Sequence, residues 1–154
     1  MATIDKCEIA PRTSGVETPQ RERPRVLLAD DHDFFLSRVM SVLKLDFDVV
    51  GTVNDGGALV CEAQRLHPDL IVLDIAMPVL NGIEAAHEIH SAYPAIKLVF
   101  LTLHPDPQFV RACFAEGGLG YVIKSRLERD LIPAINEALL GRSFISPSVG
   151  GALL

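Results

Sequence analysis

Five polar residues of this 154-residue chain stand at the ends of short apolar runs. They are Asp30 and Asp31 after RVLLA, Asp74 after LIVL, Thr102 at the end of LVFLT, and Lys124 after GYVI. A short apolar run of this kind is typical of a buried strand. Each of the five residues is therefore predicted to lie at the carboxyl end of a strand.

These residue types suit the chemistry of a phosphoryl group. Carboxylates that lie close together repel one another, and Mg²⁺ relieves the repulsion because it accepts carboxylates together with waters. Asp30, Asp31 and Asp74 are therefore predicted to form a Mg²⁺ site. Lys124 and Thr102 add a positive charge and a hydroxyl donor for phosphoryl oxygens. Because carboxylates can accept phosphoryl groups, the arrangement favours an aspartate nucleophile.

Each of these residues also has a purely structural explanation. Asp33 and its acidic neighbours could begin a helix, where carboxylates favour the positive end of the dipole. Asp74 could be a turn residue, and Lys124 could be the solvated end of a strand. Such explanations account for the residues one at a time, whereas polar residues at the ends of strands one, three, four and five together favour a shared site.

The elements that must position these residues alternate along the chain. Apolar runs predict strands at 25–29, 48–53, 69–74, 96–102 and 119–124. Amphipathic segments predict helices at 34–44, 58–67, 82–93, 107–117 and 127–140, with Pro133 in or just after the first turn of the last. The alternation predicts a doubly wound α/β fold with a five-stranded parallel sheet. In such a sheet the carboxyl ends of the strands open onto the crevice that binds ligands.

Sequence texture divides the chain into three parts. Residues 1–23 mix Pro, Gly, Ser, Thr and charge without periodicity and are predicted to be a flexible N-terminal extension. Residues 24–141 form the predicted domain. Residues 142–154 are rich in Gly and Ser and are predicted to be a C-terminal linker or tail.

Composition narrows the classes of function. The hydrophobic fraction of 49% is that of a globular protein, and the net charge of −6 disfavours nucleic-acid binding through this chain, which needs clustered Lys and Arg. No apolar stretch approaches the roughly 20 residues of a membrane helix, and the N-terminus lacks the order of a signal peptide. We therefore predict a cytoplasmic protein that does not contact membranes.

Four motifs, in this order and spacing, resemble those of a response regulator receiver domain. They are LLADDHDFF (27–35), DLIVLDIAMPVLNG (69–82), VFLT (99–102) and GYVIKS (120–125). The pattern is most similar to receivers of LuxR- and NarL-type regulators, in which a serine follows the lysine as Ser125 does here. The resemblance implies the flavodoxin-like (CheY-like) fold, with strand order 2-1-3-4-5, for most of the chain.

The resemblance also implies a phosphorelay function. Asp74 would accept a phosphoryl group from a sensor histidine kinase. Asp31 and Asp74 would bind Mg²⁺ together with the backbone carbonyl of Ala76, and Asp30 would act through water. The chain would not be an ordinary enzyme, although self-catalysed phosphotransfer and slow autodephosphorylation are expected of it.

Three further residues match positions of the family with a role after phosphotransfer. Thr102 and Lys124 would bind the phosphoryl oxygens. Tyr121 would be the switch aromatic, whose rotation is coupled to movement of Thr102. Such a movement is a shift between two packings of one fold, and it would carry the signal.

Several alternatives stay open at this point. The chain could be a stand-alone receiver, the receiver half of a DNA-binding regulator, or a receiver-shaped module that no longer takes phosphate, and each could form a homodimer. FISPSV (144–149) resembles the linker before the DNA-binding domain of LuxR-type regulators. A haloacid-dehalogenase-like phosphatase is disfavoured because Ala76 stands where its second acid is needed. No ligand role is predicted for His32, His67, His87 or His90.

Overall fold

The structure, a computed structural model, describes residues 23–103 and 105–150. Nearly all of the predicted N-terminal extension, and residues 151–154 of the predicted tail, lie outside the described residues. The described elements are β1 (Arg25–Ala29), α1 (Asp33–Leu43), β2 (Asp48–Val53), α2 (Gly56–Leu66), β3 (Leu70–Leu73), α3 (Gly82–Ala92), β4 (Lys97–Thr102), α4 (Pro107–Ala115), β5 (Gly118–Ile123), the 3-10 turn η2 (Lys124–Arg126), α5 (Leu127–Leu139), β6 (Phe144–Ile145) and α6 (Pro147–Gly150).

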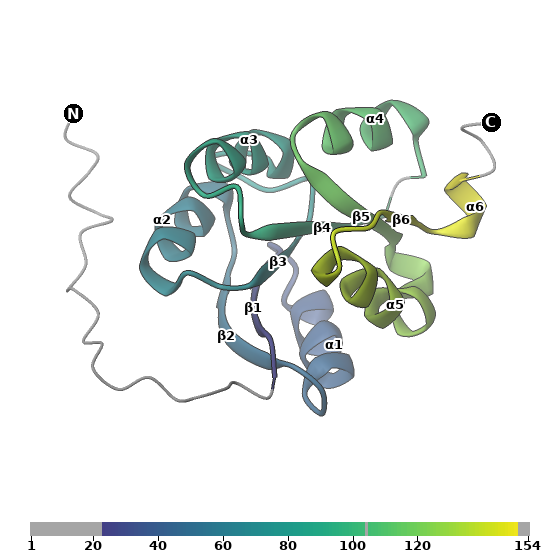
Figure 1. Ribbon diagram of the computed structural model, residues 1–154, viewed down its shortest axis with the longest axis horizontal. Helices are drawn as coiled ribbons and strands as arrows, with labels where there is room; N and C mark the ends of the chain where they lie inside the picture. The colour runs from purple at the N-terminus through teal and green to yellow at the C-terminus, as the bar shows by residue number, and fades with distance from the viewer. Residues whose placement is uncertain (1–22, 104, 151–154) are drawn as a thin grey trace.

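The strands form one parallel sheet with the order β2-β1-β3-β4-β5-β6 (Figure 1). The predicted doubly wound sheet, with the order 2-1-3-4-5, is confirmed. β6 is a short addition beyond β5 that the sequence did not predict, because two residues are too few to show a periodicity.

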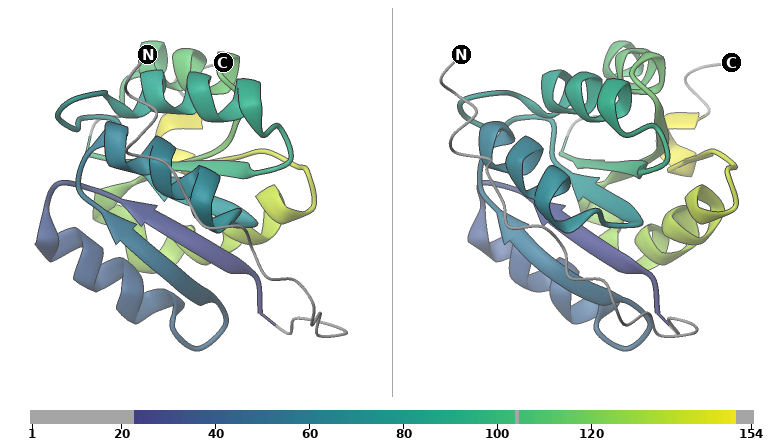
Figure 2. Two further views of the ribbon diagram at one scale, coloured as in Figure 1. Left: turned by 90° about the vertical axis from the view of Figure 1, so that its left-hand side faces the viewer. Right: turned by 60° about the vertical axis from the view of Figure 1, so that its left-hand side comes forward.

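Helices cover both faces of the sheet, as Figures 1 and 2 show. One apolar cluster joins the sheet to α2, α3 and α4, and the other joins it to α1 and α5. Alternate side chains of each strand enter opposite clusters, as they must in a pleated strand. This burial on both faces explains why the strands are almost continuously apolar in sequence.

The last long helix differs from its predicted form at Pro133. The helix begins at Leu127, so Pro133 is its seventh residue and lies in the helix interior, not in or just after the first turn as predicted. A proline there removes one backbone hydrogen bond. The buried side chains of Leu131, Ala134 and Ile135 flank it and hold the helix against the sheet, so tertiary packing outweighs that local cost.

The segment after α5 folds back onto β5. Ser146 is fully buried there, and its backbone N–H donates to the carbonyl of Tyr121 at 2.9 Å. The Ser146 hydroxyl accepts from the N–H of Ile123 at 3.1 Å and donates to Asp130 Oδ2 at 2.8 Å. Ser146 therefore connects the segment to both β5 and α5. Among the described residues, no helix is long and apolar enough to cross a membrane.

Candidate functional site

The strand alternation brings three of the predicted residues to one face of the sheet. Asp30, Asp74 and Lys124 directly follow β1, β3 and β5. The side chains two positions before them belong to the cluster beneath α1 and α5, namely Leu28, Val72 and Val122. The three polar side chains therefore lie on the face of the sheet that α1 and α5 cover, at its carboxyl edge.

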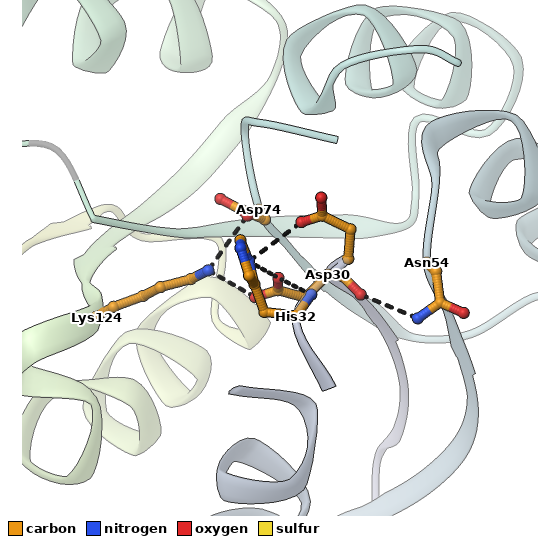
Figure 3. A network of polar contacts seen from close by, with 6 residues as sticks. Asp30, His32, Asn54, Asp74 and Lys124 are labelled. Atoms are coloured by element: carbon orange, nitrogen blue, oxygen red, sulfur yellow. Dashed lines mark hydrogen bonds and ion pairs between the residues drawn. The ribbon is translucent and has the colours of Figure 1, made fainter. Parts of the chain in front are cut away.

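Lys124 connects the two buried aspartates. Its Nζ lies 2.7 Å from Asp30 Oδ2 and 3.2 Å from Asp74 Oδ2. β4 separates β5 from β3, so a long side chain is needed to reach across. The exposed fraction is 1% for Lys124 and 4% for each aspartate, so the ammonium and both carboxylates lie almost out of water. Figure 3 shows Lys124 pointing between Asp74 and Asp30.

Asp31 and His32 are exposed residues that lie beside the two buried aspartates and form an acidic cluster with them. One ligand atom from each of Asp30, Asp31, His32 and Asp74 lies within 4.8 Å of the others. His32 Nδ1 is 3.2 Å from an oxygen of Asp30 and 3.2 Å from an oxygen of Asp31. No ligand role was predicted for His32, yet its ring lies beside the aspartates of the cluster. A histidine beside paired aspartates was the available signal.

The loop after Asp74 is held by close backbone contacts. The N–H of Gly82 donates to the carbonyl of Ile75 at 2.7 Å, and a Cβ on Gly82 would lie 2.0 Å from the Asp74 carbonyl oxygen. Only glycine therefore fits this position. Val79 has a φ of 72° and its neighbours Pro78 and Leu80 share a hydrogen bond of 2.7 Å, which makes a γ-turn. The result is a tight loop that fixes the backbone beside Asp74.

The other predicted residues lie near this edge in different settings. Thr102 is buried at the end of β4, on the face that also carries Phe100. Tyr121 is buried on that same face, and burial raises the pKa of its phenol. Ala76 is exposed in the loop after Asp74, and its carbonyl stays a predicted ligand. No peptide bond among residues 23–103 and 105–150 is cis, so the bond after Lys124 is trans.

The surroundings of Asp74 disfavour its charged form. Burial raises the pKa of this carboxyl, the nearby charge of Asp30 raises it further, and the Lys124 ammonium opposes both effects. The pKa of Asp74 in the folded chain therefore lies above its ordinary value. A buried carboxylate that is costly to ionise is one that a bound cation would stabilise.

This raised pKa predicts how Asp74→Asn should affect stability. The folded chain binds the Asp74 proton more tightly than the unfolded chain does, so ionised Asp74 lowers stability once the pH exceeds the unfolded pKa of about 3.9. We expect Asp74→Asn to raise the free energy of unfolding at pH 7 without divalent cations, and the gain to shrink as the pH falls towards about 4. Urea denaturation at both pH values measures this, and a variant less stable than wild type at pH 7 would contradict it.

The donor set fits a hard divalent cation. Asp30, Asp31 and Asp74 bring three carboxylates, and Lys124 supplies one positive charge against them. Oxygen ligands at about 2.1 Å from Mg²⁺ lie at most about 4.2 Å apart, which is close to the observed spread of the cluster. The residues present can therefore hold Mg²⁺ with little rearrangement.

Comparison with known families gives one assignment for most of the chain. The sequence model described as "Response regulator receiver domain" matches residues 26–136. The match includes all five strand-end residues and all of β1 to β5 except Arg25.

Individual relatives agree with that match. Transcriptional regulatory protein DegU of Brevibacillus brevis is 31% identical over 135 residues, which cover 86% of this chain and 57% of DegU. A LuxR-family two-component response regulator from Aurantimonas sp. SI85-9A1 has a TM-score of 0.80 at 29% identity, with 84% of this chain and 94% of that chain covered. This chain therefore spans little more than half the length of DegU.

A third relative has been solved in a state that bears on phosphorylation. The isolated REC domain of RcsB from Salmonella enterica serovar Typhimurium, solved in the presence of the phosphomimetic BeF3-, has a TM-score of 0.76 at 26% identity. The alignment covers 83% of this chain and 96% of that one. RcsB has also been solved as two dimers bound to two parallel DNAs, with a TM-score of 0.76 over 66% of that longer chain.

Proposed function

The chain belongs to the response regulator receiver domain family of two-component systems, and from this premise we propose that Asp74 accepts the phosphoryl group. The observation that carries the proposal is the contact of Lys124 with both Asp30 and Asp74 in a buried acidic cluster. The donor is a phosphohistidine of a sensor histidine kinase, the source of phosphoryl groups for such receivers. Incubation with acetyl phosphate and Mg²⁺ tests the proposal, and a single hydroxylamine-sensitive phosphate should form.

The reaction is a displacement at phosphorus. A free oxygen of the Asp74 carboxylate forms a P–O bond as the P–N bond of the phosphohistidine breaks, and the imidazole leaves with the electron pair. Bound Mg²⁺ would neutralise charge on the transferring group. Lys124 already lies beside Asp74, so its ammonium needs only a small movement to reach a phosphoryl oxygen.

Thr102 and Tyr121 have the proposed role of reporting the phosphate. The Thr102 hydroxyl donates to a phosphoryl oxygen, and its displacement opens space towards the buried ring of Tyr121. Both residues belong to the face of the sheet beneath α4, so a change at one can reach the other through packing. The two packings are states of one fold, and phosphorylation shifts the population between them.

Mg²⁺ is the proposed cofactor, bound by Asp31, Asp74 and the carbonyl of Ala76, with Asp30 through water. We expect Asp31→Ala to weaken Mg²⁺ binding about tenfold or more, because the site loses one of its few carboxylates. Calorimetric titration of the unphosphorylated protein measures this. Asp33→Ala is the matched control, since Asp33 is exposed and lies outside the acidic cluster. An unchanged Kd for Asp31→Ala would count against the metal assignment.

The output of this receiver is proposed to be transcriptional. Relatives such as DegU are transcriptional regulators, and RcsB binds DNA as dimers. The acidic net charge of −6 disfavours DNA contacts through this chain. We propose that the chain acts as the receiver half of such a regulator, or together with a separate DNA-binding partner. The nucleotide sequence downstream of Leu154 separates these two. We also propose a cytoplasmic location, a phosphorylation-sensitive homodimer, and slow self-catalysed loss of the phosphate.

A further inference from the structure

Phe35 lies against the one buried ammonium of the site. It is a half-buried residue in the first turn of α1, and the Nζ of Lys124 is 4.2 Å from the centroid of its ring. This distance is well within the range of about 6 Å for a cation–π contact. Phe35 lies within the helix predicted for 34–44, and no part in the chemistry was predicted for it.

The ring is a third neighbour of the ammonium, beside the two carboxylates. An ammonium has three N–H donors, and the Asp30 and Asp74 oxygens lie 2.7 and 3.2 Å from it. Lys124 is only 1% exposed, so water does not surround the rest of the charge. The negative face of the Phe35 ring provides an electrostatic partner there that a saturated side chain of similar size would lack.

Two further ring contacts hold Phe35 in this orientation. Phe34 meets it edge-on at 5.3 Å between centroids, and His32 meets it edge-on at 6.2 Å. Such edge contacts favour one orientation of the ring. The rings of Phe34 and His32 therefore favour the orientation in which Phe35 faces Lys124.

We propose that Phe35 is a positioning residue for phosphotransfer, which holds the Lys124 ammonium against Asp74 through the face of its ring. This inference rests on the proposed function of Asp74. The transferring phosphoryl group gains most from a positive charge that is already in place, because no reorganisation is then needed during the reaction. A lysine side chain without this contact would sample more rotamers and would spend less time beside Asp74.

Phe35→Leu is the first test, because leucine keeps an apolar side chain and removes the aromatic face. We expect phosphorylation by acetyl phosphate at saturating Mg²⁺ to be about tenfold slower than in wild type. The Kd for Mg²⁺ should change less than about twofold, since the ligands are carboxylates. Phe47→Leu is the matched control: Phe47 belongs to the same apolar cluster but stands directly before β2, at the other end of the strands, and this variant should be labelled at the wild-type rate.

Ring-fluorinated phenylalanine at position 35 is the second test, because it keeps the shape while weakening the negative potential of the face. The rate should fall step by step as fluorine atoms are added. NMR gives an independent readout: the Cε protons of Lys124 should be shifted upfield by the ring in wild type and should lose that shift in Phe35→Leu.

These experiments distinguish a failure of the proposed role of Phe35 from a failure of the proposed function of Asp74. Wild type that takes no phosphate from acetyl phosphate in Mg²⁺ overturns the proposed function itself. Labelled wild type together with an equally fast Phe35→Leu, or a rate that ignores fluorination, overturns only the role of Phe35. A folded but slow Phe35→Leu with a fluorine-dependent rate supports the proposal.

Discussion

Asp74→Asn is expected to abolish phosphorylation by acetyl phosphate in Mg²⁺. The amide has almost the same shape as the carboxylate, but its nitrogen and carbonyl oxygen lack the charge that attacks phosphorus. The loss should be complete within detection, because Asp74 is the proposed phosphoacceptor. Its carboxylate contacts Lys124, and the tight loop that follows it fixes its backbone. Mass spectrometry of the intact protein measures the added phosphoryl group.

Asp46→Asn provides the control for this experiment. It makes the same chemical change at an exposed position in the turn between α1 and β2, and it should be labelled as fast as wild type. Thermal denaturation should show that Asp74→Asn remains folded. If Asp74→Asn still took up phosphate at the wild-type rate on another residue, the assignment of the phosphoacceptor would be refuted.

Lys124→Met is expected to lower the free energy of unfolding by about 3 kcal/mol when divalent cations are absent. Methionine has a similar volume, so the main loss is the positive charge between two buried carboxylates. The remaining carboxylates repel one another in a region that excludes water. Mg²⁺ should restore much of the loss, because a cation that binds only the folded state stabilises it by mass action. Phosphorylation should also slow markedly.

Lys44→Met is the matched control, since Lys44 is exposed at the end of α1. Its unfolding should change little with the substitution and should gain no extra response to Mg²⁺. Urea denaturation of the three proteins, with and without Mg²⁺, gives the comparison. Equal stability of Lys124→Met and wild type without Mg²⁺ would show that the buried ammonium is not needed to balance the aspartates.

The sequence predicts the fold and the strand-end residues for one physical reason. In a parallel sheet the last residues of all strands lie at the same edge. The positions of Asp30, Asp74 and Lys124 at the ends of their strands therefore predict that the three residues lie close together. Alternation then decides the face, which is why Thr102 lies on the side of Tyr121. The order of the strands does not follow from such local patterns and came from family resemblance.

The parts that the sequence did not reveal depend on side-chain direction or on pairing with a distant edge. His32 and Phe35 lie where the chain enters α1, and the rotamers that turn one towards the aspartates and the other towards Lys124 have no sequence signature. Ser146 lies in a stretch rich in turn-forming residues, which predicts a linker. It is buried only because β5 offers it an open edge.

Two hydrogen bonds tie Ser146 to β5, and they restrict how the segment after α5 can move. Without these hydrogen bonds, the segment after α5 could move independently of the end of β5. Here the carbonyl of Tyr121 accepts from the backbone N–H of Ser146 and the N–H of Ile123 donates to its hydroxyl, three positions and one position before Lys124. A displacement of the end of β5 would therefore move residue 146 with it.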